Sequence, residues 1–396
     1  MRLAIIAITE NGARMGASLH RSIPGSTLFV LEKHVGASAL SSSQGPFPIT
    51  FPPLQGEGQG GDGVRVHPFT SSLRELVKGL WPAYAGFIFI MATGIVVRTI
   101  APLLRSKDQD PAVVVIDDAG RFAVSLLSGH LGGANELARR CAELSGGTPV
   151  ITTATDANDL PSFDMLAKEH GWLIEDLSHI KVLNAMLLEG KEIAVVDYDG
   201  AVKRYCAGKG RLTFHPDIES AIGSGADGML LVTNRVFGEH PLSDRTLVLR
   251  PLNLCLGIGC NRGTSAEEIA SVVNTNLDRL SLSTRSVKSI ATALAKQDEA
   301  GLLTFAEQAG LPIRVFTSEE LNDVVVPSPP SEHAFAAIGA KGVAEPAALL
   351  ASGGGRLLLH KVKAGNVTLA IAEEPHPHPG PPLEGEGAFV GEDCAY

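Results

Sequence analysis

The stretch GFIFIMATGIVVRTIAPLLRSKDQDPAVVVIDD, residues 86–118, alternates between two kinds of hydrophobic pattern. Residues 86–93 and 111–118 contain nearly continuous apolar runs rich in Val, Ile and Phe, which are typical of strands covered on both faces. Residues 94–104, which lie between them, are predicted as a short helix. A strand, a helix and a second strand in this order indicate a mostly parallel sheet with helices packed on its faces.

The same alternation extends over most of the chain. Apolar runs at residues 2–9, 26–33 and 121–128 are predicted as further strands, and residues 132–144 as a helix. The pattern weakens in the middle of the chain and restarts at residues 252–260. We therefore predict an α/β fold, with mostly parallel sheets and helices on both faces. It has three parts: an N-terminal α/β domain over residues 1–153, a middle α/β region over residues 154–250, and a separate C-terminal α/β domain over residues 252–374.

Two segments rich in Pro and Gly lie outside this pattern. Residues 46–63 and 375–393 share the motif PPL, a polar residue, then GEG. Such composition cannot bury enough apolar surface to offset the entropy lost on ordering. We therefore expect a disordered insert at residues 44–66 and a disordered tail at residues 375–396, and we favour tolerated repeats over partner-binding motifs.

Composition bounds the partners and the compartment. The 396 residues carry a formal net charge of −10, which argues against a nucleic-acid partner. No apolar run approaches the roughly 20 residues of a membrane-spanning helix, and the first residues are predicted as a strand, not as a signal peptide. Five scattered cysteines indicate a reducing environment, so we expect a cytoplasmic protein. Cys255 and Cys260 fit no compact zinc pattern and are expected to be buried thiols.

Three glycine-containing loops follow predicted strands and open predicted helices, at residues 91–98, 128–136 and 257–268. Open α/β sheets bind ligands outside the carboxyl ends of their strands, so these loops are the expected site. Free backbone N–H groups at a helix start could hold a carboxylate or a phosphate, and Arg98 and Arg262 would add positive charge. The alternative at each loop is structural, because Gly often serves only an unusual φ or close packing.

The third loop also predicts how its helix begins. Thr264 or Ser265 is placed to cap the helix, and Glu267 or Glu268 is placed to complete a capping box.

Long motifs carry a resemblance to a known family. Residues 87–138, from FIFIMATGIVVR to SGHLGGANELA, and PVITTATD at residues 149–156 closely resemble the cobalt-precorrin-5A hydrolases of the anaerobic cobalamin pathway. GIGCNRGTSAEEI at 257–269, GLLTFAEQAGLPIRVFTSEELN at 301–322 and EPAALLA at 345–351 match the C-terminal domain of that family. The resemblance covers nearly the whole chain apart from the two Pro- and Gly-rich segments. The chain departs from the family in lacking a cysteine before EPAAL and in carrying the insert.

The resemblance implies a substrate and a reaction. The substrate would be a cobalt-bearing tetrapyrrole fringed with acetate and propionate groups. The enzyme would be a hydrolase of cobalamin biosynthesis that opens the ring A δ-lactone of cobalt-precorrin-5A with water and releases acetaldehyde, to give cobalt-precorrin-5B. Cobalt enters as part of the substrate, so no cofactor and no protein-bound metal are expected. The sequence does not decide the oligomeric state. A homodimer is possible under this interpretation, and so are transient contacts with neighbouring enzymes of the cobalamin pathway.

The loops and the resemblance together select candidate site residues. His130 is a candidate base or acid, because histidine titrates near neutral pH, with a hydrogen bond to a neighbouring loop as the alternative. Glu136 and Asp117 are further catalytic candidates. Helix-dipole complementarity alone would explain Glu136, and for Asp117 we favour a role in a turn. The candidates for substrate binding are Thr93, Gly94, Arg98, Lys107, Ser128, Gly129, Gly132, Gly133, Asn135, Asp156, Gly259, Arg262, Gly263 and Thr264.

Two other functions stay open at this point. A tetrapyrrole carrier or pathway scaffold would present the same anion-binding loops without turnover. A nucleotide-binding enzyme fits less well, because no G-x-G-x-x-G follows a predicted strand and the sequence holds no G-x-x-x-x-G-K-[ST].

Overall fold

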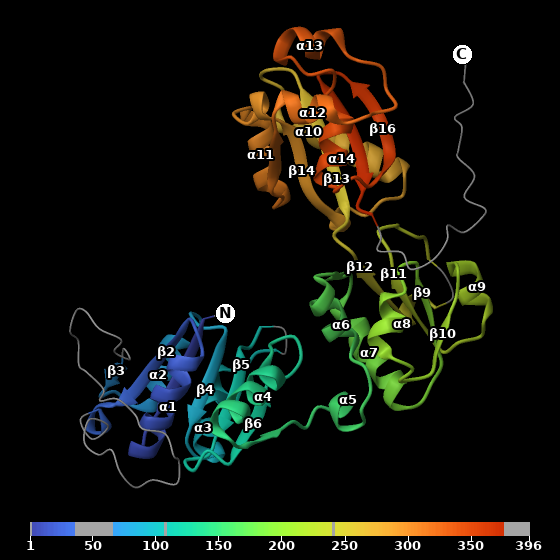
Figure 1. The fold of residues 1–396 in the computed structure, drawn as a ribbon. Coiled ribbons are helices and arrows are strands. Elements are labelled where there is room, and N and C mark those ends of the chain that lie inside the picture. The colour runs from blue at the N-terminus through green and yellow to red at the C-terminus, as the bar shows by residue number, and fades with distance from the viewer. Residues whose placement is uncertain (1, 36–65, 107–108, 240–241, 376–396) are drawn as a thin grey trace. The chain divides into compact units, whose positions relative to one another are not determined.

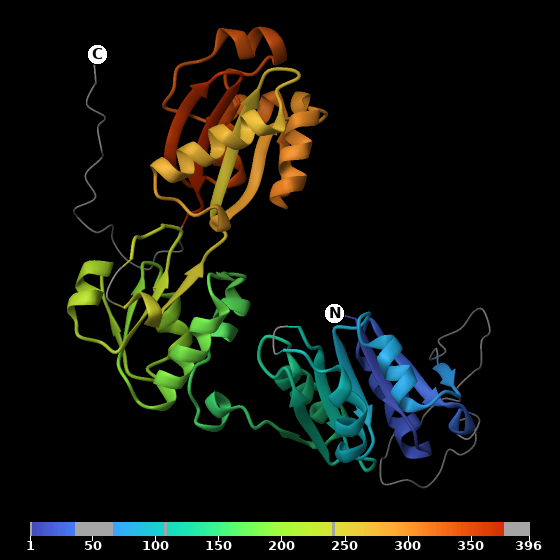
Figure 2. The same cartoon turned by 180° about the vertical axis from the view of Figure 1, so that it is seen from behind.

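The computed structural model describes residues 2–35, 66–106, 109–239 and 242–375. The chain divides into two compact units, Met1–Met165 and Leu166–Tyr396. Figure 1 and Figure 2 show the helices and strands of both units from two opposite sides. Within the described ranges, no helix is both long enough and apolar enough to cross a membrane. The insert expected at residues 44–66 and the tail expected at residues 375–396 lie outside the described residues, apart from Val66 and Pro375.

The first unit is built on one seven-stranded sheet in the order β3-β2-β1-β4-β5-β6-β7. Every neighbouring pair is parallel except β5 and β6. The strands are β1 (Leu3–Ala7), β2 (Ser26–Leu31), β3 (Val66–Phe69), β4 (Gly86–Ile90), β5 (Ala112–Ile116), β6 (Phe122–Leu127) and β7 (Thr148–Val150). The helices are α1 (Glu10–Ser22), α2 (Leu73–Leu80), α3 (Thr93–Ile100), α4 (Ala134–Ser145), α5 (Ala154–Ala157) and the start of α6 (Phe163–His170).

Apolar side chains cover both faces of this sheet. Ile5 of β1 belongs to the buried cluster that includes α1 and α4, whereas the next residue, Ile6, belongs to the cluster on the other face. That second cluster includes Val77 of α2 and Val96 of α3. Successive residues of a strand point to opposite faces, so a strand buried on both faces must be apolar throughout. This is the physical reason for the continuous apolar runs in the sequence.

Strand β6 reverses the direction of the chain within the sheet. Val113, near the start of β5, pairs with Leu127 at the end of β6, and Ile116 pairs with Ala123. The carboxyl end of β6 therefore lies at the same edge as the amino ends of β4 and β5. The loop after β6 consequently lies at the edge opposite to the loops that follow β1, β4 and β5.

The second unit holds two five-stranded sheets. The middle sheet has the order β10-β9-β11-β12-β8, with β8 antiparallel to β12. Its elements, with the helices beside it, are α7 (Leu177–Leu188), α8 (Ala201–Cys206), α9 (Ile218–Gly223), β8 (Leu173–Ile174), β9 (Ile193–Asp197), β10 (Leu212–Phe214), β11 (Gly228–Val232) and β12 (Thr246–Arg250).

The C-terminal sheet has the order β15-β14-β13-β17-β16, with β17 antiparallel to both of its neighbours. Its strands are β13 (Leu254–Cys260), β14 (Val287–Ala293), β15 (Ile313–Phe316), β16 (Arg356–Ala364) and β17 (Val367–Glu373). Its helices are α10 (Ala266–Arg279), α11 (Ala300–Ala309), α12 (Ser318–Asp323), α13 (Glu332–Ile338) and α14 (Ala344–Ala351). The predicted fold class, an α/β protein with mostly parallel sheets in several regions, is confirmed.

Candidate active site

The loop after β6 turns the chain directly into α4. Ser128, where the strand ends, has a φ of 55°, a left-handed conformation that few residues other than glycine adopt. Gly133 caps α4 with a φ of 89°. A Cβ on Gly132 would lie 2.4 Å from the Cβ of Ser128 and 2.6 Å from its carbonyl oxygen. The geometry of the loop itself therefore requires glycine at positions 132 and 133, as the structural alternative proposed.

The backbone N–H groups at the start of α4 are already engaged. Those of Gly133, Ala134 and Asn135 donate in turn to the carbonyl oxygens of His130, Ser128 and Gly129. The expectation of free N–H groups at this helix start is wrong for these three residues, because the loop folds back and satisfies them.

The imidazole of His130 lies between two carboxylates. Its Nε2 is 2.9 Å from Oδ2 of Asp156, and its Nδ1 is 3.4 Å from Oδ2 of Asp164. The hydroxyls of Thr155 and Ser162 each lie 3.3 Å from one of the two ring nitrogens. A ring nitrogen facing a carboxylate carries a proton, so this arrangement stabilises the doubly protonated imidazolium.

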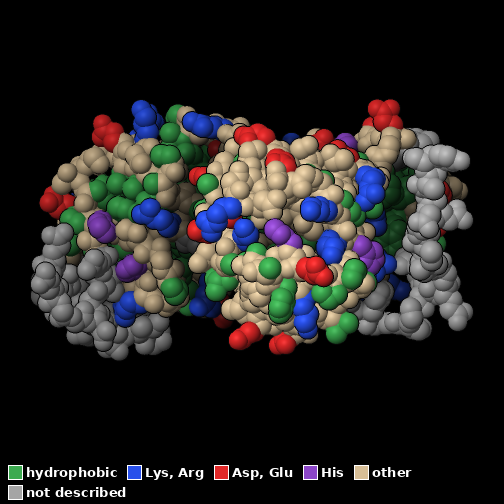
Figure 3. All heavy atoms as spheres, turned by 90° about the horizontal axis from the view of Figure 1, so that it is seen from above, with side chains coloured by type: hydrophobic (Ala, Val, Ile, Leu, Met, Phe, Trp, Pro, Cys, Tyr) green, Lys and Arg blue, Asp and Glu red, His purple; other side chains and the backbone are tan. Residues whose placement is uncertain are grey.

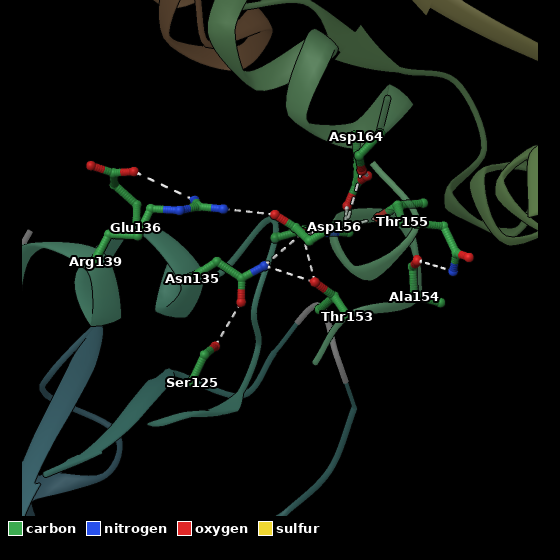
Figure 4. Close-up of polar contacts among 12 residues, drawn as sticks. Ser125, Asn135, Glu136, Arg139, Thr153, Ala154, Thr155, Asp156 and Asp164 are labelled. Carbon is green, nitrogen blue, oxygen red and sulfur yellow. Dashed lines mark hydrogen bonds and ion pairs between the residues drawn. The ribbon is translucent and has the colours of Figure 1, made fainter. Parts of the chain in front are cut away.

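Three donors besides His130 fix the carboxylate of Asp156 (Figure 4). Thr153 Oγ1 and Asn135 Nδ2 donate to its Oδ2 over 2.6 Å and 3.0 Å, and Arg139 Nη2 donates to its Oδ1 over 2.7 Å. The buried Asn135 is itself oriented, because the hydroxyl of Ser125 donates to its Oδ1 over 2.7 Å. The network thus ties the segment after β7 to the loop after β6 and to α4.

The charges of this cluster shift the pKa values of all three titratable groups. The hydrogen bond to Asp164 is the largest effect on His130 and raises its pKa above 6.5, helped by Asp156 and opposed by burial. Burial alone would raise the pKa of Asp156, but hydrogen bonds from Thr153, His130 and Arg139 outweigh it and the pKa is lowered. Asp164 behaves in the same way, with His130 and Ser162 as its partners. Each shift favours the charged form of its group, so the contacts stabilise one cation between two anions.

Sequence reasoning missed several members of this cluster. Asp164 and Ser162 precede and open α6, where an acid and a hydroxyl are ordinarily explained by helix capping and the helix dipole. Thr153, Thr155 and Arg139 were also missed. Arg139 contacts Asp156 across 17 positions of the chain, and Thr155 contacts His130 across 25, so no local spacing in the sequence marks these pairs. Thr153 contacts the nearby Asp156 but belongs to a short polar run that has no distinctive pattern.

The structure places the other N-terminal candidates at the opposite edge of the sheet. Thr93 and Gly94 begin α3 after β4, and Arg98 Nη1 donates to the carbonyl of Gly94 over 2.9 Å. Asp117 follows β5, accepts from the backbone N–H of Phe122 over 2.7 Å and shapes the turn into β6. The loops at residues 91–98 and 128–136 therefore do not converge on one site, because β6 runs antiparallel to β5.

Glu136, in contrast, lies close to the His130 cluster. Its side chain, 76% exposed, is 3.8 Å from Arg139, the same guanidinium that binds Asp156. Ser128, Gly129, Gly132, Gly133, Asn135, Glu136 and Asp156 are thus the sequence candidates that the fold gathers around His130.

The remaining candidates lie in the C-terminal domain or outside the described residues. Arg262 is 3.8 Å from Asp298 and 3.6 Å from Glu299, and the N–H of Gly263 donates to Glu299 over 3.2 Å. Thr264 is buried, with its hydroxyl bonded to the carbonyl of Asn261. Gly259 lies inside β13, and Lys107 lies outside the described residues.

The predicted start of α10 is confirmed in part. Ser265 is the N-cap, and its side chain accepts from the N–H of Glu268 over 3.2 Å. The carboxylate of Glu268 accepts instead from the N–H of Asn366 over 2.8 Å. The two partners therefore do not form the reciprocal box that the sequence suggested.

The described residues hold no cluster of the kind that binds a metal ion. In the part of the chain that the structure describes, no three His, Cys, Asp or Glu residues are arranged to hold a metal ion. The two carboxylates beside His130 face opposite ring nitrogens, which is a geometry for an imidazolium. Cys255 and Cys260 are buried and free, as expected. In the view of Figure 3, basic and acidic side chains are interspersed, so positive charge on that face is presented by individual residues.

Comparison with known proteins gives the class to which this fold and site belong. Three family models match in succession: Cobalamin synthesis G N-terminal at residues 75–156, Cobalamin biosynthesis central region at 161–251, and Cobalamin synthesis G C-terminus at 254–372. The first ends at Asp156 and therefore includes the His130 loop.

Individual relatives show which family within cobalamin biosynthesis the chain resembles. A Priestia megaterium protein named cobalt-precorrin-5A hydrolase is 36% identical over 378 residues, covering 94% of this chain and 95% of the relative. A Salmonella typhimurium protein of the same name is 34% identical over 306 residues, covering 77% and 86%. A crystal structure described as a cobalamin biosynthesis protein G homolog from Sulfolobus solfataricus is 23% identical, with a TM-score of 0.33, and covers 94% of this chain and 97% of its own. The chain belongs to the cobalt-precorrin-5A hydrolase family, the enzymes of cobalamin biosynthesis that its sequence resembles.

Proposed function

We propose that this chain hydrolyses cobalt-precorrin-5A and that the protonated His130 supplies a proton in the reaction. Water would add to the carbonyl of the ring A δ-lactone, and the bond from that carbonyl carbon to the ring oxygen would break. The alkoxide formed would collapse to the carbonyl of acetaldehyde as its carbon–carbon bond to the macrocycle breaks. The electron pair of that bond stays on the macrocycle carbon, which takes up a proton.

The observation that carries this assignment is the imidazole between two carboxylates. A group whose protonated form is stabilised by two carboxylates is better suited to donate a proton than to accept one, so the geometry favours the acid role over the base role left open by the sequence. The ring is 17% exposed, which leaves it accessible from one side. Glu136, whose carboxylate is exposed beside Arg139, is the proposed base that activates water.

Substrate carboxylates would be held by individual arginines. Arg139 presents a half-exposed guanidinium at the His130 cluster, in the same compact unit as the proposed acid. The loop N–H groups of Gly133, Ala134 and Asn135 are occupied by their own loop, so this proposal does not use them as an oxyanion site. An anionic macrocycle needs only a few such positive groups, even on a protein with a net charge of −10.

Release of acetaldehyde tests the function directly. The purified full-length protein is incubated with cobalt-precorrin-5A without oxygen, and acetaldehyde is measured by its reduction with alcohol dehydrogenase and NADH. We expect one acetaldehyde for each macrocycle converted. Binding of the macrocycle with no acetaldehyde would overturn the proposal in favour of a tetrapyrrole carrier.

The finer properties are proposed on the same basis. We propose a cytoplasmic enzyme that needs no cofactor beyond the cobalt of its substrate, so treatment with a chelator should leave the rate unchanged. We also propose that the chain forms a homodimer and contacts neighbouring cobalamin-pathway enzymes transiently. Light scattering in solution, alone and with those enzymes, tests both statements.

A further inference from the structure

We propose that Asp164 is a positioning residue: from the buried side of the cluster it holds the imidazole of His130 in its protonated form, with Nε2 turned toward the exposed side. The inference rests on the proposed function for its catalytic meaning. The effect of Asp164 on the charge and orientation of His130 can be measured without any catalytic turnover.

Burial increases across the cluster in one direction. The exposed fraction falls from 26% for the Asp156 side chain to 17% for His130 and 8% for Asp164. The Nε2–H, shared with Asp156, is therefore on the side that a substrate can reach, and the Nδ1–H points inward to Asp164. A buried acid thus orients the histidine through one nitrogen, as in catalytic histidines, while the other nitrogen is held by Asp156, which a substrate would displace.

Asp164 and His130 complete one another's contacts. The hydroxyl of Ser162 donates to Oδ1 of Asp164, which leaves Oδ2 turned to the Nδ1 of His130. A carboxylate this deeply buried is costly unless a cation or donors meet it. A neutral His130 can present one N–H only, and would turn a lone pair toward one of its two carboxylates. A proton on both nitrogens therefore satisfies the two carboxylates best.

The charges around His130 single out Asp164 over Asp156. The carboxylate of Asp156 is shared among His130, Arg139, Asn135 and Thr153, so much of its charge is already compensated. The contacts of Asp164 are with His130 and Ser162, and Ser162 is neutral. We therefore expect Asp164 to raise the pKa of His130 more than Asp156 does, although Asp156 lies closer to the ring, at 2.9 Å against 3.4 Å. Arg139, the nearest further cation, reaches His130 only through Asp156.

The decisive variant is Asp164→Asn, which keeps the shape of the side chain and removes its charge. The imidazole of His130 is followed by NMR over a pH titration, and its signals are assigned by their loss in His130→Asn. We expect the pKa of His130 to fall in Asp164→Asn. Asp197→Asn is the matched control, because Asp197 is a largely buried carboxylate in the middle sheet that accepts from the backbone N–H groups of Val202 and Asp199. This control should leave the titration of His130 unchanged.

The rate of acetaldehyde release supplies the second readout. If the protonated ring is the acid, kcat/KM falls as pH rises through the pKa of His130 in the free enzyme, and in Asp164→Asn this limb moves to lower pH by the amount seen in NMR. At a pH above the pKa, kcat/KM should fall about tenfold for each unit of that shift. Asp164→Glu, which restores the carboxylate, should recover part of the loss.

An unchanged titration of His130 in folded Asp164→Asn would overturn the positioning role. A shifted titration with an unshifted kcat/KM profile would overturn the catalytic meaning of the contact between Asp164 and His130, because the proton measured by NMR would not be the one used in the reaction. Should Asp164→Asn fail to fold, the wild-type protein decides: the ¹⁵N shifts must show both nitrogens protonated at pH 6.5, and a neutral ring there overturns the inference. A wild-type protein that releases no acetaldehyde refutes the proposed function and leaves the NMR result standing.

Discussion

The Nε2 of His130 lies 2.9 Å from Oδ2 of Asp156, a residue 26 positions later in the chain. This contact joins the loop after β6 to the segment that leaves β7, and it lies at the edge of the first sheet formed by the amino ends of β4 and β5. Parallel α/β sheets usually place their ligands at the other edge. The reversal of β6 brings the carboxyl end of one strand to this edge, and a histidine with it.

Substitution of His130 separates the acid role from a structural one. His130→Ala and His130→Asn should bind the macrocycle nearly as the wild type does, yet turn over at least ~100-fold more slowly, the usual scale for loss of a general acid. Asn can keep a hydrogen bond to one carboxylate but cannot transfer a proton at neutral pH. The measurement is kcat and KM for acetaldehyde release. Near-normal kcat in His130→Asn would show that His130 only holds the loop in place, and Glu136 would then be the candidate for the acid–base chemistry.

The same cluster predicts how stability depends on pH. Because folding raises the pKa of His130 above 6.5, its contribution is fully present below pH 6.5 and is lost as pH rises through the higher folded value. Because folding lowers the pKa values of Asp156 and Asp164 below 3.8, their contribution is present above that pH and is lost as pH falls through the lower folded values. The melting temperature of the wild type relative to His130→Asn should thus be greatest near about pH 5 to 6 and decline on the alkaline side. A difference that grows with rising pH would show that the folded protein favours neutral His130.

The sequence predicted the fold because periodicity is a local property. Apolar strands such as the one around Phe89 alternate with helices, and each pattern can be recognised without knowing which strand pairs with which. The direction of β6 cannot be recognised in this way, since the pairing of Val113 with Leu127 leaves no mark in either segment alone. That single reversal separated Arg98 from His130.

The site was predicted only where loops carry glycines or a histidine. His130 and Asn135 were candidates because they lie in such a loop, and Asp156 because it follows a predicted strand. The structure joins all three. Asp164 was missed because its partner lies in a loop more than 30 residues earlier, and the start of a helix offers an ordinary explanation for an acid. The role of the glycines was also ambiguous in sequence, since close packing and ligand approach call for the same residue.

Asn135 tests how far the cluster depends on its buried amide. Asn135→Ala removes the donors to Thr153 and Asp156 and leaves the hydroxyl of Ser125 without its acceptor. The loss of buried hydrogen bonds with unpaired groups left behind should lower the free energy of unfolding by about 1–3 kcal/mol. The matched control is Asn158→Ala, where an exposed amide donates to the carbonyl of Ala154 and the change should be small. Equal effects of the two substitutions on chemical denaturation would contradict the role given to Asn135.

Arginine substitutions show which edge of the first sheet meets the macrocycle. With the chemistry at His130, Arg98 lies at the opposite edge of the sheet, so Arg98→Ala should change the dissociation constant of the substrate less than twofold. Arg139→Ala, which removes the guanidinium beside Asp156, should raise it about tenfold, the effect of losing one charge-assisted contact of ~1.5 kcal/mol, and should weaken its dependence on salt. Arg140→Ala, which removes an exposed guanidinium paired with Glu143 on α4, is the control and should change neither. A tenfold loss of affinity in Arg98→Ala would place the substrate carboxylates at the loop of residues 91–98, and would move the reaction to the edge where Asp117 lies.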